Sequence, residues 1–275
     1  MTLKEIIKLH ESLGISLIKD GIRYFMDNGK VTVFPEDDFE GVDIKLMPGV
    51  EIIADEAFDS FYDLRSVTLP DGVKSIGQAA FANCLALEEI IIPESVTEIQ
   101  TEAFYSCIRL SNISLPKGLL NIAAGLFGEC SNLKEISIPE GVTTIGDNAF
   151  SNCATITSIK IPESVWYIGT GAFWDCFALE SITIPKGVTH IMNDTFWDCH
   201  GLKSIEIPEK VTSIGETAFY NCDGLQTIEI PKNVTSLGHQ AFYGCYNLKK
   251  VTLPKALEGS IPLAFNQDGI EFKFI

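Results

Sequence analysis

Hydrophobic and polar residues follow one another along this chain in a pattern that recurs every 23 residues. One unit, starting at Leu87, reads LEEIIIPESVTEIQTEAFYSCIR. Its opening L-x-x-I-x-I places Ile90 and Ile92 two positions apart, the spacing of side chains that share one face of a β-strand. The unit therefore predicts a short strand whose apolar face turns inward.

The rest of the unit predicts a turn, a second short apolar segment and a further turn. Pro93 lacks an N–H group and fixes its own φ, so it ends the strand and suits a tight turn. The V-T-x-I that follows is the second apolar segment. Ala103, Phe104 and Cys107 are spaced so that small and large side chains fall on the inner side of a helical or 3₁₀ turn.

The repeat keeps its register through most of the chain. Every 23rd residue from Phe58 to Phe265 is phenylalanine, and all eight cysteines occupy one slot, meaning one position within the 23-residue unit. The cysteines are Cys84, Cys107, Cys130, Cys153, Cys176, Cys199, Cys222 and Cys245. A fixed period of this size is typical of a solenoid, in which each coil buries its apolar side only against its neighbours.

The unit resembles the leucine-rich repeat of the treponemal, BspA-like class, L-x-x-I-x-I-P-x-x-V-T-x-I-G-x-x-A-F-x-x-C, and the likeness runs from Ile44 to Phe265. The resemblance implies an α/β repeat solenoid of about ten coils, capped at both ends. It would be a right-handed superhelix with short parallel strands on the concave face and short helical or 3₁₀ turns elsewhere. It also implies a scaffold for adhesion or protein binding, often at a microbial surface. No catalytic residue carries over, because the motif positions are structural.

The two ends of the chain depart from the repeat and are predicted to cap it. We expect an N-terminal cap over residues 1–43, a solenoid of 23-residue units over residues 44–265 and a C-terminal cap over residues 266–275. The closing sequence EFKFI is expected to cover the last coil.

The N-terminal cap is predicted to contain a helix and a hairpin. An amphipathic pattern indicates a helix that ends near Gly14. The apolar residues of that pattern are Leu3, Ile6, Ile7 and Leu13. IRYFM and KVTVF then flank Asn28 and Gly29, and Asn-Gly favours the type I′ turn of a β-hairpin.

The chain is acidic, with 37 Asp and Glu against 20 Lys and Arg and a formal net charge of −17. Repulsion disfavours direct binding to nucleic acid or to an anionic membrane, and the charge favours basic protein partners. Lys4, Glu5 and Lys8 interrupt the apolar run that a secretory signal needs, and no apolar run elsewhere has membrane-spanning length. We expect a soluble chain that is not exported by the usual route, unless it is the mature part of a longer protein.

The cysteines are predicted to form a buried ladder of small apolar side chains. Equivalent residues of neighbouring coils lie about 4.8 Å apart and point the same way, whereas a disulfide needs Cβ atoms within about 4.5 Å that face each other. A single file also cannot surround a zinc ion tetrahedrally, and neither a metal nor another cofactor is expected. Free thiols favour the cytoplasm and the family resemblance favours a cell surface or secretion, so localisation stays open.

The slot after the repeat phenylalanine holds the main candidate for a binding surface. Large aromatic residues fill it in four consecutive units, and three further aromatics lie nearby in the sequence. The predicted partner-binding residues are Trp166, Tyr167, Trp174, Phe177, Trp197, Tyr220 and Tyr243. Exposed Trp and Tyr clusters are typical of interface hot spots. The alternative is an aromatic stack that only stiffens the convex side.

Asp175 and Asp198 share the next slot, beside the tryptophans. Stacked in register, their carboxyl groups would approach the separation of about 5 to 5.5 Å used by retaining glycosidases. Two equivalent side chains on one ladder are solvated alike, so nothing distinguishes an acid from a nucleophile. We expect solvated surface carboxylates and predict no catalytic residue.

The sequence favours a non-enzymatic interaction scaffold and leaves two other functions open. The leading hypothesis is a rigid monomer that binds a host, matrix or intracellular protein through the aromatic residues or the strand face. The second is an acidic inhibitor or nucleic-acid mimic that occupies a basic groove of a nuclease or regulator. The third is a carbohydrate-binding or glycosidase-like site near Trp174 and Asp175.

Overall fold

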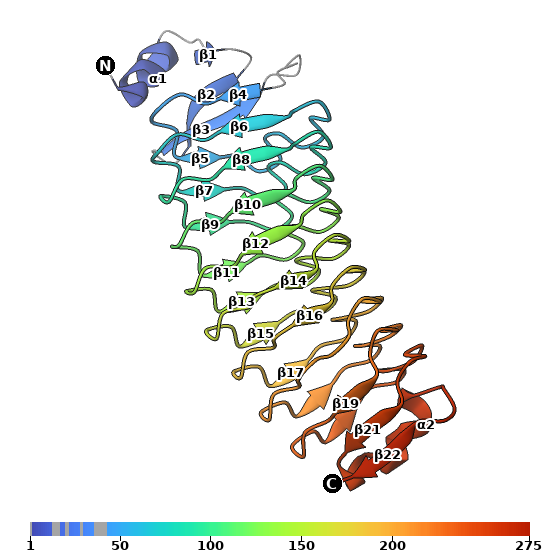
Figure 1. Ribbon diagram of the computed structural model, residues 1–275. Coiled ribbons are helices and arrows are strands. Elements are labelled where there is room, and N and C mark those ends of the chain that lie inside the picture. The colour runs from blue at the N-terminus through green and yellow to red at the C-terminus, as the bar shows by residue number, and fades with distance from the viewer. Residues whose placement is uncertain (1, 13–16, 20–21, 28–29, 36–42) are drawn as a thin grey trace.

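The computed structural model describes residues 2–12, 17–19, 22–27, 30–35 and 43–275. Coils of equal length stack along one axis into an elongated solenoid (Figure 1), and two rows of short strands run along it. Each coil contributes one strand to each row in most of the repeat. The predicted fold is confirmed, with little helix.

The first strand row is built from the L-x-x-I-x-I segments. The second residue of each strand, which is the first isoleucine of the pattern or its equivalent, is buried in nearly every strand. Its strands are β4 (Asp43–Lys45), β6 (Ser66–Thr68), β8 (Glu89–Ile91), β10 (Asn112–Ser114), β12 (Glu135–Ser137), β14 (Ser158–Ile159), β16 (Ser181–Ile182), β19 (Thr227–Glu229) and β21 (Lys250–Leu253). Paired strands are parallel, and residues 23 apart face each other, as Asn112 faces Glu135. Ser204 continues the row as a single bridge to Ser181.

The second strand row is built from the V-T-x-I segments. Its two-residue strands are β5 (Ile52–Ile53), β7 (Ser75–Ile76), β9 (Glu98–Ile99), β11 (Asn121–Ile122), β13 (Thr144–Ile145), β15 (Tyr167–Ile168), β17 (His190–Ile191), β18 (Ser213–Ile214) and β20 (Ser236–Leu237). They pair in parallel with the same offset of 23 residues. Identical coil length therefore keeps each side chain beside its equivalent.

A third hydrogen-bonded row is formed by the turn segments, which we define as the ten residues from four before to five after each repeat phenylalanine. In one of them, the N–H groups of Glu102, Phe104 and Ser106 donate to carbonyl groups of the next coil. The alternate N–H groups close tight turns. The N–H of Tyr105, for example, donates to the carbonyl oxygen of Glu102, with 2.9 Å between nitrogen and oxygen. Glu102 and Ser106 both have a φ of 59°, in the left-handed region.

The predicted helical or 3₁₀ conformation of this segment is replaced by these turns. Every second N–H leaves the segment to bond the neighbouring coil, so no continuous run of bonds within the segment can form a helix. Among the described residues, helix is confined to the two ends of the chain.

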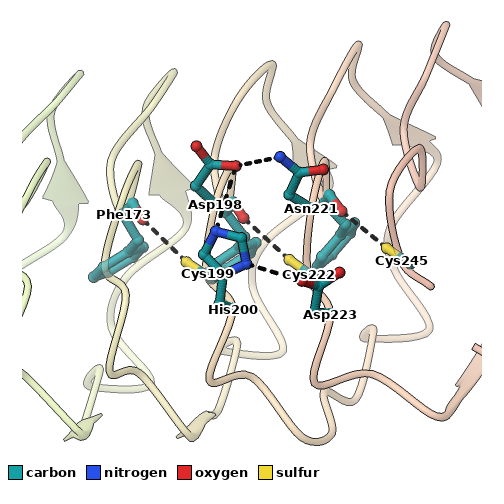
Figure 2. A network of polar contacts seen from close by, with 10 residues as sticks. Phe173, Asp198, Cys199, His200, Asn221, Cys222, Asp223 and Cys245 are labelled. Carbon is teal, nitrogen blue, oxygen red and sulfur yellow. Dashed lines mark hydrogen bonds and ion pairs between the residues drawn. The ribbon is translucent and has the colours of Figure 1, made fainter. Parts of the chain in front are cut away.

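The core is a continuous stack of the repeat phenylalanines. Neighbouring ring centroids from Phe58 to Phe265 are 5.0 to 5.8 Å apart, and the rings are close to parallel. The cysteine ladder runs beside them, with all eight thiols free and buried. Each thiol donates a hydrogen bond to the phenylalanine carbonyl of the preceding coil, as Cys199 does to Phe173 (Figure 2). The ladder was predicted, and this hydrogen bond was not.

At the N-terminal end, α1 (Leu3–Ser12) buries Leu3 and Ile7. The strand β1 (Leu17–Lys19) pairs with β2 (Ile22–Asp27), which is antiparallel to β3 (Lys30–Pro35). Because β3 pairs in parallel with β5, the hairpin extends the second strand row. The predicted helix end at Leu13 and Gly14, and the turn at Asn28 and Gly29, lie outside the described residues.

At the C-terminal end, a 3₁₀ helix η1 (Lys255–Ser260) occupies the positions of the second-row strand, and α2 (Ile261–Ala264) occupies the first part of the turn segment. The strand β22 (Glu271–Phe274) then pairs with β21 and brings Phe272 edge-on against Phe265, with ring centroids 5.4 Å apart. The division into caps and solenoid at residues 43 and 265 stays a prediction. No helix in the described part of the chain is both long and apolar enough to cross a bilayer.

Candidate functional site

Four of the predicted residues occupy one slot in consecutive coils, and we name them the aromatic column: Trp174, Trp197, Tyr220 and Tyr243. Trp197 stacks on Tyr220 with ring centroids 4.5 Å apart, and Tyr220 stacks on Tyr243 at 5.2 Å. Trp174 is the most open member, with 42% of its surface exposed. Each residue follows a buried phenylalanine, so it points away from the core.

The other three predicted residues lie elsewhere on the coils. Trp166 comes just before β15, is 58% exposed and contacts Tyr167, whose hydroxyl donates to Asp147 at 3.4 Å. Phe177 packs against His200. Within the described residues no ring contact joins these three to the aromatic column. The seven predicted residues therefore occupy three places rather than one patch.

The column begins at Trp174 because the preceding coils have small residues in its slot. Ser151 is buried, and the ring of Tyr105 covers Gly128 so closely that a Cβ at Gly128 would lie 2.9 Å from it. The indole of Trp174 thus has a large neighbour only on its C-terminal side. This asymmetry leaves part of the indole open.

A hollow of about 250 Å³ lies beside the two tryptophans. It is lined by Asn148, Thr170, Gly171, Trp174, Asp194 and Trp197. Asn148, Gly171 and Asp194 occupy the same slot in successive coils, and all three are in the left-handed region. A Cβ at Gly171 would collide with Oδ1 of Asn148, so the Asn148 carboxamide lies against Gly171 and a side chain is not accommodated there.

Asp194 also lies at this hollow and was not among the residues predicted from the sequence. It is the carboxylate that lines the hollow, and it accepts a hydrogen bond from the Thr217 hydroxyl in the next coil. The signal that identifies it is its slot, two residues before the repeat phenylalanine. In that slot a carboxylate directly follows Gly171 along the ladder.

The carboxylates of Asp175 and Asp198 belong to a different row and do not line the hollow. Both residues have φ near 55°, a conformation that Asp and Asn adopt more readily than most residues. Partial burial, followed by the nearby Asp198, raises the pKa of Asp175 above its usual value.

Asp198 belongs to a polar network with the next coil, which Figure 2 shows. It accepts a hydrogen bond of 2.8 Å from the Asn221 amide. His200 lies between two carboxylates, with Nδ1 3.2 Å from Asp223 and Nε2 3.9 Å from Asp198. In the described residues no group of three or more His, Cys, Asp or Glu side chains is arranged to hold a metal ion.

The turn segments, some of which carry the aromatic column, are acidic because they contain almost no basic residues. Between residues 54 and 247, Arg109 is the only lysine or arginine in a turn segment. The carboxylates there are Asp55, Glu56, Asp59, Asp63, Glu102, Glu129, Asp147, Asp175, Asp194, Asp198, Glu216 and Asp223. The turn segments that hold the column therefore contain carboxylates and neither lysine nor arginine.

Comparison with protein families agrees with the repeat geometry. The BspA type leucine rich repeat region matches residues 51–180 and 166–273. The chain belongs to this family. Among curated proteins, no relative was found.

Several solved bacterial structures are similar to this leucine-rich repeat protein. A leucine rich cell surface protein from Faecalibacterium prausnitzii A2-165 is 25% identical, with a TM-score of 0.54 and 94% of each chain covered. The leucine rich repeat protein of T. pallidum is 24% identical, with a TM-score of 0.50, over 94% of this chain and 98% of that one. The pneumococcal vaccine antigen PcpA is 18% identical, with a TM-score of 0.56, over 95% and 88% of the two chains. The last two likenesses show the fold alone.

Proposed function

We propose that this leucine-rich repeat protein is a non-enzymatic scaffold that binds a protein partner through the aromatic column. The observation that carries the proposal is that the fold does not require aromatic residues in this slot. Asp59, Ala82, Gly128 and Ser151 occupy the same slot in coils of the same geometry. The exposed ring of Trp174 and the stacked, partly exposed rings of Trp197, Tyr220 and Tyr243 are thus available for recognition.

The size of the column suits an interaction hot spot. Four coils span about 15 Å at the spacing of a strand ladder, and a few central aromatic residues usually supply most of the binding energy of an interface. The similar protein from F. prausnitzii is described as a cell surface protein. This likeness supports a partner encountered at a cell surface.

The experiment compares three immobilised proteins: the wild type, the double variant Trp174→Ala with Trp197→Ala, and the control Trp166→Ala. Each is exposed, with cross-linking, to proteins of the environment in which the source cell grows. Trp166 is a matched control because it is also an exposed tryptophan but lies outside the column. We expect at least one protein that the wild type and the control retain and that the double variant loses by ten-fold or more.

The stability of the variants decides how a loss is interpreted. Because both tryptophans point away from the core, the thermal midpoint of the double variant is expected within about 2 °C of the wild type. A partner retained equally by the double variant, or no retained protein in any sample, counts against the proposal.

The acidic turn segments favour one other candidate function, an inhibitor that occupies a basic groove in place of nucleic acid. Such binding depends on many charges and weakens steeply with salt, on the order of a hundred-fold between 50 and 500 mM. Binding through the aromatic column changes far less over that range. Measuring the affinity of a captured partner at both salt concentrations separates the two functions.

A further inference from the structure

We infer that the hollow beside Trp174 and Trp197 receives an arginine side chain of the protein partner. This inference rests on the proposed function and names the chemistry that the column recognises. The hollow offers two indole rings and one carboxylate, that of Asp194. No lysine or arginine is among its lining residues.

The residues that line the hollow match both the flat shape and the positive charge of a guanidinium group. A planar cation stacks favourably on the electron-rich face of an indole, and arginine does this more often than lysine. The Asp194 carboxylate lies at the same hollow and supplies the opposite charge. A volume of about 250 Å³ equals roughly eight waters, so the hollow fits the end of one long side chain and not a folded element.

The charge around the hollow favours a cation over an apolar group. Four consecutive turn segments, from residue 146 to residue 224 along the ladder, carry six carboxylates and neither lysine nor arginine. They are Asp147, Asp175, Asp194, Asp198, Glu216 and Asp223. In the described residues the basic side chains that lie within 4 Å of carboxylates of this group are the histidines His200 and His239.

An apolar side chain in the same place would be less favourable. A leucine or phenylalanine would remove water from the Asp194 carboxylate and return no hydrogen bond or charge, and burial of an unpaired charge is costly. A guanidinium replaces the lost water with N–H donors. The Thr217 hydroxyl uses only one of the acceptor positions of the Asp194 carboxylate. The remaining positions can accept hydrogen bonds from a guanidinium group.

The test follows the indole N–H resonances of the three tryptophans in a ¹H–¹⁵N spectrum, assigned with Trp→Phe variants. The probes are N-acetyl-arginine amide and the neutral analogue of the same shape, N-acetyl-citrulline amide. We expect arginine to shift the Trp174 and Trp197 resonances saturably at millimolar concentration and to leave Trp166 unmoved. Citrulline is expected to bind at least ten-fold more weakly.

The variant Asp194→Asn removes the charge and little else. Asn148 occupies the same slot at a φ of 54°, close to the 57° of Asp194, so asparagine is compatible with this backbone. Asparagine can also still accept the Thr217 hydroxyl. We expect this variant to bind the arginine probe at least five-fold more weakly, with the same thermal midpoint within about 2 °C.

Equal binding of citrulline, an unchanged affinity of Asp194→Asn, or shifts confined to Trp166 would overturn the inference. None of these results contradicts the proposed function. That function is tested separately, by the loss of a protein partner in the Trp174→Ala and Trp197→Ala double variant. Conversely, a partner retained by that double variant refutes the proposed function even if the arginine probe binds.

Discussion

The Cys153 thiol donates a hydrogen bond to the carbonyl oxygen of Phe127 in the preceding coil, with 3.2 Å between Sγ and oxygen. The same carbonyl accepts the N–H of Cys130, so one phenylalanine carbonyl joins two coils. The thiol bond recurs at all eight cysteines, and at Cys84 the second donor to the shared carbonyl is the N–H of Phe61. The buried thiols are therefore donors that need their protons, and not only small apolar side chains.

The first prediction is that the protein loses stability steeply above pH 9. Burial raises the pKa of Cys130 and Cys176 to about 12, whereas the usual value is 9.0. Between these values the unfolded chain releases thiol protons that the folded chain retains, which costs about 1.4 kcal/mol per pH unit for each thiol. The contribution is complete below pH 9 and is lost as the pH rises towards 12. Thermal unfolding from pH 7 to pH 11 measures it.

The variant Cys130→Ala provides the control for the alkaline effect. It removes one titrating thiol, so its stability should fall less steeply with pH than that of the wild type. A thermal midpoint that stays constant up to pH 11 in the wild type contradicts the prediction.

The second prediction concerns the phenylalanine stack. Phe150 is fully buried between the rings of Phe127 and Phe173, so Phe150→Ala should lower the free energy of unfolding by about 3 to 5 kcal/mol. Phe265 is 7% exposed and belongs to the last coil, so Phe265→Ala should cost less. Urea unfolding of both variants gives the comparison, and equal losses would argue against a stack that is anchored at its centre.

The third prediction concerns Asp175, whose pKa is raised by partial burial and by Asp198. A raised pKa means that the folded state favours the protonated acid, so the ionised carboxylate opposes folding above the usual value of 3.8. Asp175→Asn should increase the thermal midpoint at pH 7, and the gain should vanish near pH 3. Because Asp175 is only partly buried, solvent screening limits the gain to below about 1 kcal/mol.

Asp63→Asn is the matched control for Asp175→Asn. It removes one exposed carboxylate from a turn segment and so reproduces the change in net charge. An identical increase in both variants would assign the effect to net charge instead of to the surroundings of Asp175.

The fourth prediction concerns Thr217, which has a φ of 52° although its side chain is β-branched. A β-branched residue is strained in the left-handed region, where asparagine is among the most tolerant non-glycine residues. Thr217→Asn should therefore raise the free energy of unfolding by roughly 0.5 to 1 kcal/mol. Thr212→Asn on the exposed edge of the second strand row is the control, and a loss of stability in Thr217→Asn would show that its bond to Asp194 outweighs the strain.

The sequence predicted the coils because each repeated residue has one structural task. Phe150, Pro93 and Cys153 fill the same slots as their equivalents, so spacing alone identifies the stack, the strand ends and the thiol ladder. The conformation of the turn segments was predicted as helical or 3₁₀, and this prediction was wrong. Their N–H groups bond to the next coil, and a pattern of apolar residues within one unit does not reveal a bond to another unit.

The candidate site was predictable only in part. The aromatic column follows from one slot, so Trp174 and Trp197 were found. Trp166 and Phe177 are close in sequence but occupy other slots, and proximity along the chain does not place residues on one surface of a coil. Asp194 was not predicted because the sequence of one unit does not show which side chains of neighbouring coils line a common hollow.

Equal coil length has a consequence for the evolution and engineering of this molecule. Excision of residues 131–153 would join Cys130 to Ala154, which holds the slot of Ser131, so every remaining side chain would meet a partner of the same kind. A cut whose length is not a multiple of 23 residues would leave one coil of the wrong length at the junction, and its apolar residues would no longer meet their equivalents in the neighbouring coils. The protein can thus be shortened or extended in whole coils. The consecutive coils that carry the four aromatic rings and the hollow could likewise be moved as one unit into another solenoid of the same coil length.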